Sequence, residues 1–244
     1  KSTATLGYKG LMEQNLRNQD YHHAFVYAEK LFELNPYIEK LYPTLVNIIG
    51  KSKNWNQLIL ITKKAYNKKI IDISTFNENT SIAYYEIGKI KMHSEPEESL
   101  NLILKAIKLK KGFPPFIKLH LEILYQQGEV SKLIKIIKKY WNESPNSSLR
   151  KIISLFLKEN KLDEVNNIKL IIKNNHSEKE SKKLLVDFAI KNSNWTLARD
   201  SIIGLINKNP DREICEFMAL IELGEHNDKQ KSDAWYLRAQ NSST

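Results

Sequence analysis

The chain has 244 residues, of which 41% are apolar, enough to bury a substantial core in one or two domains. Glycine (8 residues) and proline (7 residues) are scarce, and leucine, isoleucine, lysine, glutamate and asparagine dominate, which favours helices over sheets. The single cysteine, Cys215, excludes an internal disulfide and a cluster of metal-bound thiolates.

A short pattern recurs along the chain. The pattern starts with an acidic or amide residue, which is followed by an aromatic residue, two variable residues and a small residue. A proline follows the small residue twelve positions later. This pattern runs from Asp20 to Pro36 and from Asn194 to Pro210. A looser copy runs from Glu129 to Pro145. The residues equivalent to the small one lie 34, 41, 34, 32, 33 and 34 positions apart: Ala24, Leu58, Ser99, Leu133, Val165, Ala198 and Ser232. A step near 34 built from two helices is the period of the tetratricopeptide repeat, or TPR.

The pattern therefore predicts about seven helix–turn–helix repeats, at residues 5–36, 37–69, 79–112, 113–145, 146–177, 178–210 and 211–240. Each predicted helix carries apolar residues at i, i+3, i+4 and i+7, so each buries a stripe against its neighbours. The predicted fold class is all-α: a TPR-like α-solenoid, wound as a right-handed superhelix and forming one domain over residues 1–244.

The first repeat shows how each helix pair is expected to be joined. Asp20 precedes the second helix and can cap it, and Tyr21 is expected to pack back on the first helix of the same repeat. Trp55 and Trp195 occupy the position of Tyr21 in the second and sixth repeats.

The later repeats depart from this scheme in three places. Residues 70–79 are inserted before the third repeat, and they are either a working face of the array or a tolerated elongation, as an extended helix or as a loop. The fifth repeat lacks its terminal proline, and residues 174–177 are expected to turn instead. The seventh repeat is expected to close with a short helix near residues 231–239, capped by Asp228.

No catalytic or metal-binding constellation emerges from the sequence. His22 and His23 are adjacent, so on a helix they diverge by about 100° and cannot form the i, i+4 pair of a zinc site. His120 lies on a stripe expected to face the core, which favours a packed histidine over a haem ligand, and Cys215 is likewise interpreted as a packing residue. His93, His176 and His226 are expected in turns without acidic or cysteine partners at metal-binding spacing. No phosphate-binding loop, nucleophile elbow or zinc-protease motif is present, so neither an enzyme nor a bound cofactor is predicted.

The expected site is the concave groove, because the first helix of each TPR lines the inner surface where a peptide or partner helix docks. The polar and aromatic residues at inward positions are Lys9, Glu13, Asn47, Tyr84, Lys91, Lys118, Glu122, Tyr125, Arg150 and Lys183. An ordinary solvated inner wall is the alternative for each of them. The carboxylate clamp of chaperone-type arrays is not supported, because Lys9 is followed by Glu13 where that clamp has asparagine.

The net charge of +10 leaves an acidic partner and a general enrichment in lysine as alternatives. Two lysine-rich stretches, residues 105–118 and 132–139, spread their charges around the solvated faces of helices. Aromatic side chains are not interleaved there, as a platform for stacking bases requires. An RNA-binding array is therefore the weakest of three functional hypotheses, and no specific nucleic acid is expected as a partner.

Both ends of the chain resemble one family. Leu6-Gly7-Tyr8-Lys9-Gly10-Leu11, with Asn18 to Tyr21 and Ala24 to Pro36, is similar to the opening of the TPR region of HemY proteins. Residues 212–222, 225–228 and Ala234-Trp235 resemble the closing segment of that family in its alphaproteobacterial form, and residues 113–115 and 140–145 match between them. The resemblance covers nearly the whole chain.

The resemblance implies a bacterial inner-membrane protein with N-terminal transmembrane helices and a TPR domain, expected on the cytoplasmic side and associated with late haem synthesis. It implies no catalytic residues, and the expected function is a scaffold that docks enzymes handling porphyrins; a porphyrin or haem carrier is the alternative. This sequence has no apolar run of the roughly 18 residues that a membrane helix needs. Because it also starts without methionine, we expect that an N-terminal part, such as a membrane anchor, has been removed.

Overall fold

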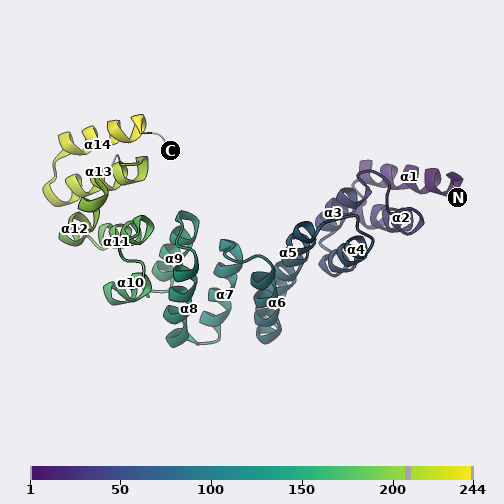
Figure 1. Ribbon diagram of the computed structural model, residues 1–244, viewed down its shortest axis with the longest axis horizontal. Helices are drawn as coiled ribbons and strands as arrows, with labels where there is room; N and C mark the ends of the chain where they lie inside the picture. Colours follow the sequence, from purple (N-terminus) through teal and green to yellow (C-terminus); the bar gives the residue numbers. More distant parts are fainter. Residues whose placement is uncertain (1, 207–209, 243–244) are drawn as a thin grey trace. The chain divides into compact units, whose positions relative to one another are not determined.

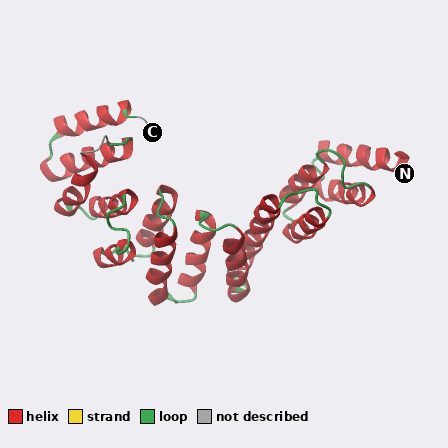
Figure 2. Cartoon of the chain, viewed as in Figure 1, coloured by secondary structure: helices red, strands yellow, loops and turns green. Residues whose placement is uncertain are grey.

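The computed structural model describes residues 2–206 and 210–242, and within these ranges the chain is helical with no strand (Figures 1 and 2). Fourteen helices follow one another in these ranges: α1 (Ser2–Arg17), α2 (Tyr21–Leu34), α3 (Leu41–Ser52), α4 (Trp55–Asn67), α5 (Ile73–Lys91), α6 (Pro96–Leu109), α7 (Pro114–Gln126), α8 (Val130–Glu143), α9 (Ser147–Glu159), α10 (Val165–Ile172), α11 (Lys179–Lys191), α12 (Trp195–Ile206), α13 (Arg212–His226) and α14 (Lys229–Asn241). Taken in consecutive pairs, from α1/α2 to α13/α14, these helices fit the predicted number of seven helix pairs, while the bounds of the repeats stay a prediction.

This arrangement confirms the predicted fold class, an all-α TPR-like solenoid. Consecutive helices pack on one another from α1 to α6 and again from α10 to α14. The chain divides into two compact units, an N-terminal unit that ends at Ile123 and a C-terminal unit that starts at Leu124. The single domain and the right-handed winding stay predictions. Among the described helices, none combines the length and the apolarity that crossing a bilayer requires.

The core of the N-terminal unit follows the apolar stripes of the sequence. Ala24 on α2, Leu45 and Ile49 on α3, and Ile61 and Ala65 on α4 are fully buried in one cluster. Tyr21 and Trp55 pack against this cluster, which spans several repeats. The expected contact of Tyr21 with the first helix of its own repeat stays a prediction.

Small residues set the spacing of the third repeat. Ser99 Oγ on α6 donates a hydrogen bond of 2.6 Å to the carbonyl oxygen of Gly88 on α5. A Cβ on Gly88 would already stand 3.4 Å from the carbonyl oxygen of Ser99. Gly88 and Ser99 therefore let α5 and α6 approach closely.

The helix starts show which capping predictions hold. The Asp20 and Asp228 side chains accept the backbone N–H of His23 and Lys231, so both predicted caps are confirmed. Asn194 caps α12 in the same way through the N–H of Leu197. Asn54, in the equivalent place before α4, makes no such bond.

The insertion before the third repeat lengthens a helix. Asp72 caps α5 by accepting the N–H of Thr75, and α5 then runs for 19 residues to Lys91. Residues 73–79 therefore form the first turns of α5, and residues 70–72 form the connection from α4. Of the two forms left open by the sequence, the structure has the extended helix.

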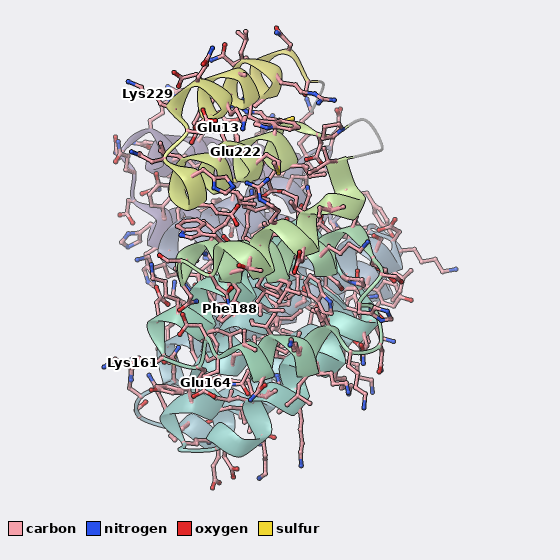
Figure 3. All side chains as sticks on the ribbon, turned by 90° about the vertical axis from the view of Figure 1, so that its left-hand side faces the viewer. Glu13, Lys161, Glu164, Phe188, Glu222 and Lys229 are labelled. Atoms are coloured by element: carbon pink, nitrogen blue, oxygen red, sulfur yellow. The ribbon has the colours of Figure 1, made fainter. Side chains whose placement is uncertain are left out.

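The fifth repeat departs from its neighbours. Its second helix, α10, has only 8 residues and starts after Glu164 (labelled in Figure 3), at the residue aligned with Ala24, whereas the other second helices start three residues before their aligned residue. The predicted turn over residues 174–177 is confirmed.

In the C-terminal unit, the indole N–H of Trp141 donates to Ser181 Oγ at 2.8 Å, which ties α8 to α11. Trp195 lies against Gly224 on α13, the first helix of the following repeat, where any Cβ would overlap the indole ring. The aromatic that opens α12 thus packs forward along the array, and the absence of a side chain at residue 224 makes the contact possible.

Candidate partner-binding site

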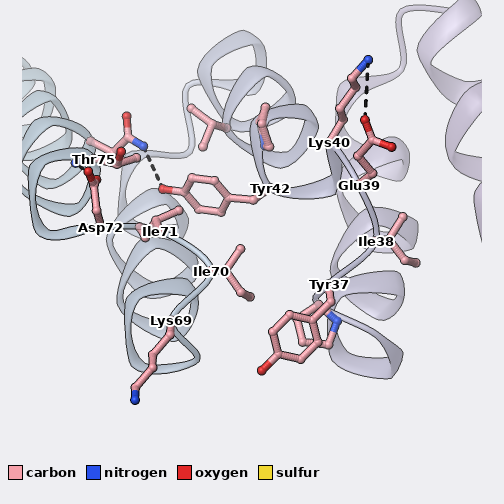
Figure 4. A pocket seen from close by; sticks show the side chains of 14 residues that line it. Tyr37, Ile38, Glu39, Lys40, Tyr42, Lys69, Ile70, Ile71, Asp72 and Thr75 are labelled. Carbon is pink, nitrogen blue, oxygen red and sulfur yellow. Dashed lines mark hydrogen bonds and ion pairs between the residues drawn. The ribbon is translucent and has the colours of Figure 1, made fainter.

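A pocket of about 760 Å³ opens in the N-terminal unit, where the α2–α3 connection lies opposite the α4–α5 connection (Figure 4). We call it the α3/α5 pocket. It is lined from both connections and from the first turns of α3 and α5: Pro36, Tyr37, Ile38, Glu39, Lys40, Tyr42, Pro43, Val46, Lys69, Ile70, Ile71, Asp72, Thr75 and Asn79. The inserted segment 70–79 therefore supplies one side of this pocket.

Local sequence explains why both connections hold their shape. Asn35 ends α2, Pro36 cannot continue the helix, and the N–H of Tyr37 donates to Asn35 Oδ1 at 3.1 Å. Lys40 and Lys69 both adopt left-handed backbone conformations, with φ of 61° and 57°, which turn the chain into α3 and away from α4. Both sides of the pocket are therefore turns with fixed hydrogen bonds.

Apolar side chains form the walls and a neutral hydrogen-bond network forms the polar part. Ile38, Ile70 and Ile71 are half-buried, while Tyr42 is buried. The Tyr42 hydroxyl accepts from Asn79 Nδ2 at 2.8 Å and shares a hydrogen bond of 3.1 Å with Thr62 Oγ1. Burial raises the pKa of Tyr42 above its ordinary value, although the bonds to Thr62 and Asn79 oppose this, so the phenol is neutral at physiological pH.

Tyr37 is the most exposed aromatic side chain of the pocket. It is 70% exposed, and its hydroxyl donates to the backbone carbonyl of Lys68 at 3.3 Å. Figure 4 shows its ring on one side of the pocket and Ile70 on the other. An apolar group entering the pocket would meet both.

The charges around the pocket differ in how they are engaged. Glu39 forms an ion pair of 4.0 Å with Lys40, and the Asp72 carboxylate accepts the N–H of Thr75 at 2.8 Å. That bond to the backbone lowers the pKa of Asp72. In the described part of the chain, no acidic side chain lies within ion-pair distance of the exposed Lys69. Lys69 is thus available to a ligand.

The groove residues predicted in the N-terminal unit do not converge on this pocket. Lys9, Glu13 and Asn47 are exposed, and Asn47 follows the pocket residue Val46 on α3. Lys118 and Glu122 form an i, i+4 ion pair of 3.5 Å with each other. The two remaining members are held by neighbours, Tyr84 under the ammonium of Lys105 and Lys91 by Glu95 and Glu98.

Two predicted groove residues of the C-terminal unit are buried in an ion-pair network. Arg150 on α9 is 2% exposed and Lys183 on α11 is 3% exposed. Arg150 Nε donates to Glu180 Oε2 at 3.0 Å, and Arg150 Nη2 donates to Glu213. Lys183 Nζ lies 2.8 Å from Glu213 Oε2 and 2.9 Å from Asp211 Oδ2. Glu213 is therefore shared by both cations, and three successive repeats are joined through it.

The network changes the proton affinities of its members. Burial alone would lower the pKa of Lys183, but the hydrogen bonds to Glu213 and Asp211 outweigh it, so the pKa is raised. Burial would raise the pKa of Glu213, but the bonds from Lys183 and Arg150 lower it overall. Lys183 and Glu213 are thus charged at neutral pH, and the cations Arg150 and Lys183 are paired within the chain.

The acids of this network and the lining of the α3/α5 pocket were not predicted. A signal for the acids was present, because Glu180 follows Arg150 and Glu213 follows Lys183 by 30 residues each, close to one repeat step. The pocket had a weaker signal in the two adjacent isoleucines of the insertion, Ile70 and Ile71. A cleft of about 420 Å³ lies beside the network, and charged side chains of α9, α11 and α13 line most of it. Tyr125, the remaining predicted groove residue, packs edge-on against Phe156.

The candidate chemical groups lie as follows. His22 and His23 are exposed on α2, and Cys215 and His120 are buried, as expected for packing residues. His226 ends α13 instead of lying in a turn, and its Nε2 is 3.3 Å from Glu225 Oε2. In the ranges that the structure covers, no three of the His, Cys, Asp and Glu side chains are grouped to hold a metal ion.

No protein-family model matches the sequence, and no curated protein matches it. Among solved structures, a tetratricopeptide repeat protein from Parabacteroides merdae is 12% identical, with a TM-score of 0.40, over 99% of this chain and 94% of that one. MamA is 18% identical, with a TM-score of 0.41, over 71% of this chain and 92% of that one. A complex of the TPR2AB domain of yeast Sti1 with pHSP90 is 9% identical, with a TM-score of 0.29, over 98% of this chain and 100% of that one. At these identities and scores the assignment of the fold rests on the helices of the chain itself.

Proposed function

We propose that the protein is a non-catalytic interaction scaffold that binds a partner protein through the α3/α5 pocket. The observation that carries the proposal is the pocket itself, which has a volume of about 760 Å³, is walled by isoleucines and is edged by the exposed Tyr37. Pockets that combine apolar walls with a few fixed polar groups are typical binding sites. The longer repeat step at this place supplies one wall, so the site is a local departure from the repeat.

Site-directed photo-crosslinking tests this proposal. A photoreactive phenylalanine analogue at residue 37, in the full-length protein in its native cell, is expected to capture one specific protein. The same analogue at Leu60, which is 52% exposed on α4 outside the pocket, is the matched control. Equal capture from both positions, or capture from neither, would contradict the proposal.

The ten predicted groove residues stay proposals of a second contact surface. Lys9, Glu13 and Asn47 are accessible, whereas Arg150 and Lys183 are paired inside the C-terminal unit. A partner that contacts the groove is therefore expected to respond to charge reversal at Lys9 or Glu13. Reversal at Arg150 would act through folding instead.

A role beside the porphyrin-handling enzymes of the bacterial inner membrane is a narrower proposal. It is supported by the similarity of residues 6–11 and 212–222 to the HemY family. Crosslinking from the full-length protein in its native membrane tests it, and the expected neighbours are enzymes of late haem synthesis. Reproducible neighbours from another pathway would refute this narrower role and leave the scaffold function intact.

Haem or porphyrin binding is the alternative, motivated by His120 and Tyr125, which both lie on α7. His120 is 6% exposed, so iron could reach its ring only after α7 has shifted against its neighbours. Titration of the purified chain with haem at micromolar concentration is the test. A Soret shift that a His120→Phe variant abolishes would support a carrier, and an unchanged spectrum would contradict it.

A further inference from the structure

We infer that the occupant of the α3/α5 pocket is an acidic protein segment that inserts one large apolar side chain between Tyr37 and Ile70 and places a carboxylate beside Lys69. This inference rests on the proposed function and specifies the chemistry of the partner. Three features of the pocket support it: its unfilled apolar walls, its free cation and its two engaged carboxylates.

The apolar walls require an apolar guest. Ile38, Val46, Ile70 and Ile71 are only partly covered by the chain, and the Tyr37 ring stands open to solvent. Covering such surface is favourable in proportion to the apolar area removed from water. An aromatic or leucine side chain is the natural guest, because one such group can touch both walls at once. The hydroxyl of Tyr42, held by Asn79 and Thr62, fixes the polar part of the pocket before any ligand arrives.

The free cations select the charge of the guest. Lys69 lines the pocket, and its neighbour Lys68 is also exposed; within the residues described, neither forms an ion pair. Figure 4 shows Lys69 at the end of the pocket away from Glu39 and Lys40. A carboxylate near Lys69 would complement this end of the pocket.

The engaged carboxylates argue against a continuous polyanion. A nucleic acid strand or an anionic lipid surface carries phosphates at regular, close spacing. Glu39 and Asp72 lie on the same pocket as Lys69 and would repel the neighbouring phosphates. A protein segment can instead place a single carboxylate at Lys69 and an apolar side chain between the isoleucines. The observations therefore favour an acidic peptide segment over nucleic acid or membrane.

Selection from a displayed library of random peptides, each about twelve residues long, tests the inference. The full chain is the bait, and the Tyr37→Ala chain is used for counter-selection so that only peptides that need the pocket survive. Enriched peptides are expected to share one phenylalanine, leucine or tryptophan with aspartate or glutamate within a few residues. Enrichment of basic or uniformly polar peptides, or no enrichment beyond the counter-selected chain, would overturn it.

Matched variants then measure the two parts of the recognition. Lys69→Glu is expected to weaken the selected peptide about fivefold or more, with a smaller loss at high salt, because an exposed ion pair is screened. Lys63→Glu, also exposed but outside the pocket, is the control and is expected to change the affinity less than about twofold. An equal effect of both substitutions would mean that the overall charge of the chain attracts the peptide, and it would overturn the assignment of Lys69.

The crosslinking experiment separates this inference from the proposed function. If residue 37 captures a partner and the crosslinked segment is acidic with an apolar anchor, both stand. A captured segment that is basic would refute the acidic occupant alone, because the pocket would still bind a protein. Absence of any capture at residue 37 would refute the proposed function itself.

Discussion

The two units of this chain use the same helix hairpin to bury different chemistry. In the N-terminal unit, Tyr42 at the start of α3 holds Thr62 and Asn79 in a neutral network beside an apolar pocket. In the C-terminal unit, Arg150 at the start of α9 and Lys183 on α11 are buried as ions around Glu213. The comparison shows that a residue at an inward position of a repeat array does not necessarily bind a partner, because Arg150 and Lys183 are paired within the chain instead.

The two kinds of buried network also differ in how strongly a single substitution destabilises them. Removing one partner of a buried ion pair strongly destabilises a protein, because the other charge is left buried without compensation. A neutral network loses less when one member is removed. The C-terminal unit should therefore respond most strongly to substitutions of single charged residues, and the N-terminal unit should tolerate polar substitutions around its pocket.

Removal of the shared carboxylate is expected to have the largest effect. Glu213→Gln leaves Arg150 and Lys183 buried with too few acceptors, and the expected cost in free energy of unfolding is about 3–5 kcal/mol. Urea unfolding followed by circular dichroism measures it. Glu216→Gln, which removes only the exposed pair with Arg212, is the control, with an expected cost below about 0.5 kcal/mol. Equal midpoints for the two variants would show that the network contributes no more than a surface pair.

Acidification is expected to loosen the C-terminal unit before the N-terminal unit. The pKa values of Asp211 and Glu213 are both lowered, against opposing burial, by hydrogen bonds from lysine and arginine side chains. Their contribution to stability is thus fully present above the ordinary carboxyl pKa of about 4, and it is lost as the pH falls through the lower folded values. Hydrogen exchange at pH 5 and pH 3 should show a larger loss of protection in α11 and α13 than in α2 and α3.

The Glu213→Gln variant is the control for this acid response, because it has already lost one of the titrating groups. Its C-terminal unit should lose less protection between the same two pH values. An acid response that is the same in both units, or unchanged in the variant, would assign the effect to the overall charge of the chain.

A methyl group at Gly224 is expected to destabilise the C-terminal unit. A Cβ there would overlap the indole of Trp195, and such overpacking typically costs about 1–3 kcal/mol. Gly50→Ala on α3 is the matched control, because no atom lies within 4 Å of the new Cβ and alanine favours the helix by about 1 kcal/mol. Opposite shifts in the melting temperature are expected for the two variants. Adding Trp195→Leu to Gly224→Ala should recover part of the loss.

The fold was predictable because the same apolar pattern recurs in every repeat. Each helix must bury one stripe, so the spacing of Ala24, Leu58 and Ala198 alone places hairpins and turns. Where the alignment of the repeats is inexact, the predicted helix start is inexact too: α10 starts at Val165, the residue aligned with Ala24, instead of three residues before it. The form of the insertion at residues 70–79 was left open, since a helical and an irregular segment of that composition look alike without their neighbours.

The site was much less predictable, because it depends on which side chains of different repeats meet. The inward positions of the first helices gave Arg150 and Lys183, but nothing in their own helices reveals that Glu213 neutralises both. The α3/α5 pocket joins residues more than thirty positions apart, as the hydrogen bond between Tyr42 and Asn79 shows. Periodicity within a helix carries no information on such pairs, whereas opposite charges one repeat apart would.

The smallest expected effect tests the neutral network of the N-terminal unit. Tyr42→Phe removes the hydroxyl that accepts from Asn79 and bonds Thr62 while keeping the buried ring, so the expected loss in free energy of unfolding is about 1 kcal/mol. The loss should be independent of pH below about 9, because burial raises the pKa of this phenol above its ordinary value. Tyr37→Phe, which removes an exposed hydroxyl bonded only to the Lys68 carbonyl, should cost less than about 0.5 kcal/mol. If Tyr42→Phe lowers the free energy of unfolding as much as Glu213→Gln does, the neutral network and the ionic network contribute equally to stability, and the proposed difference between the two units is wrong.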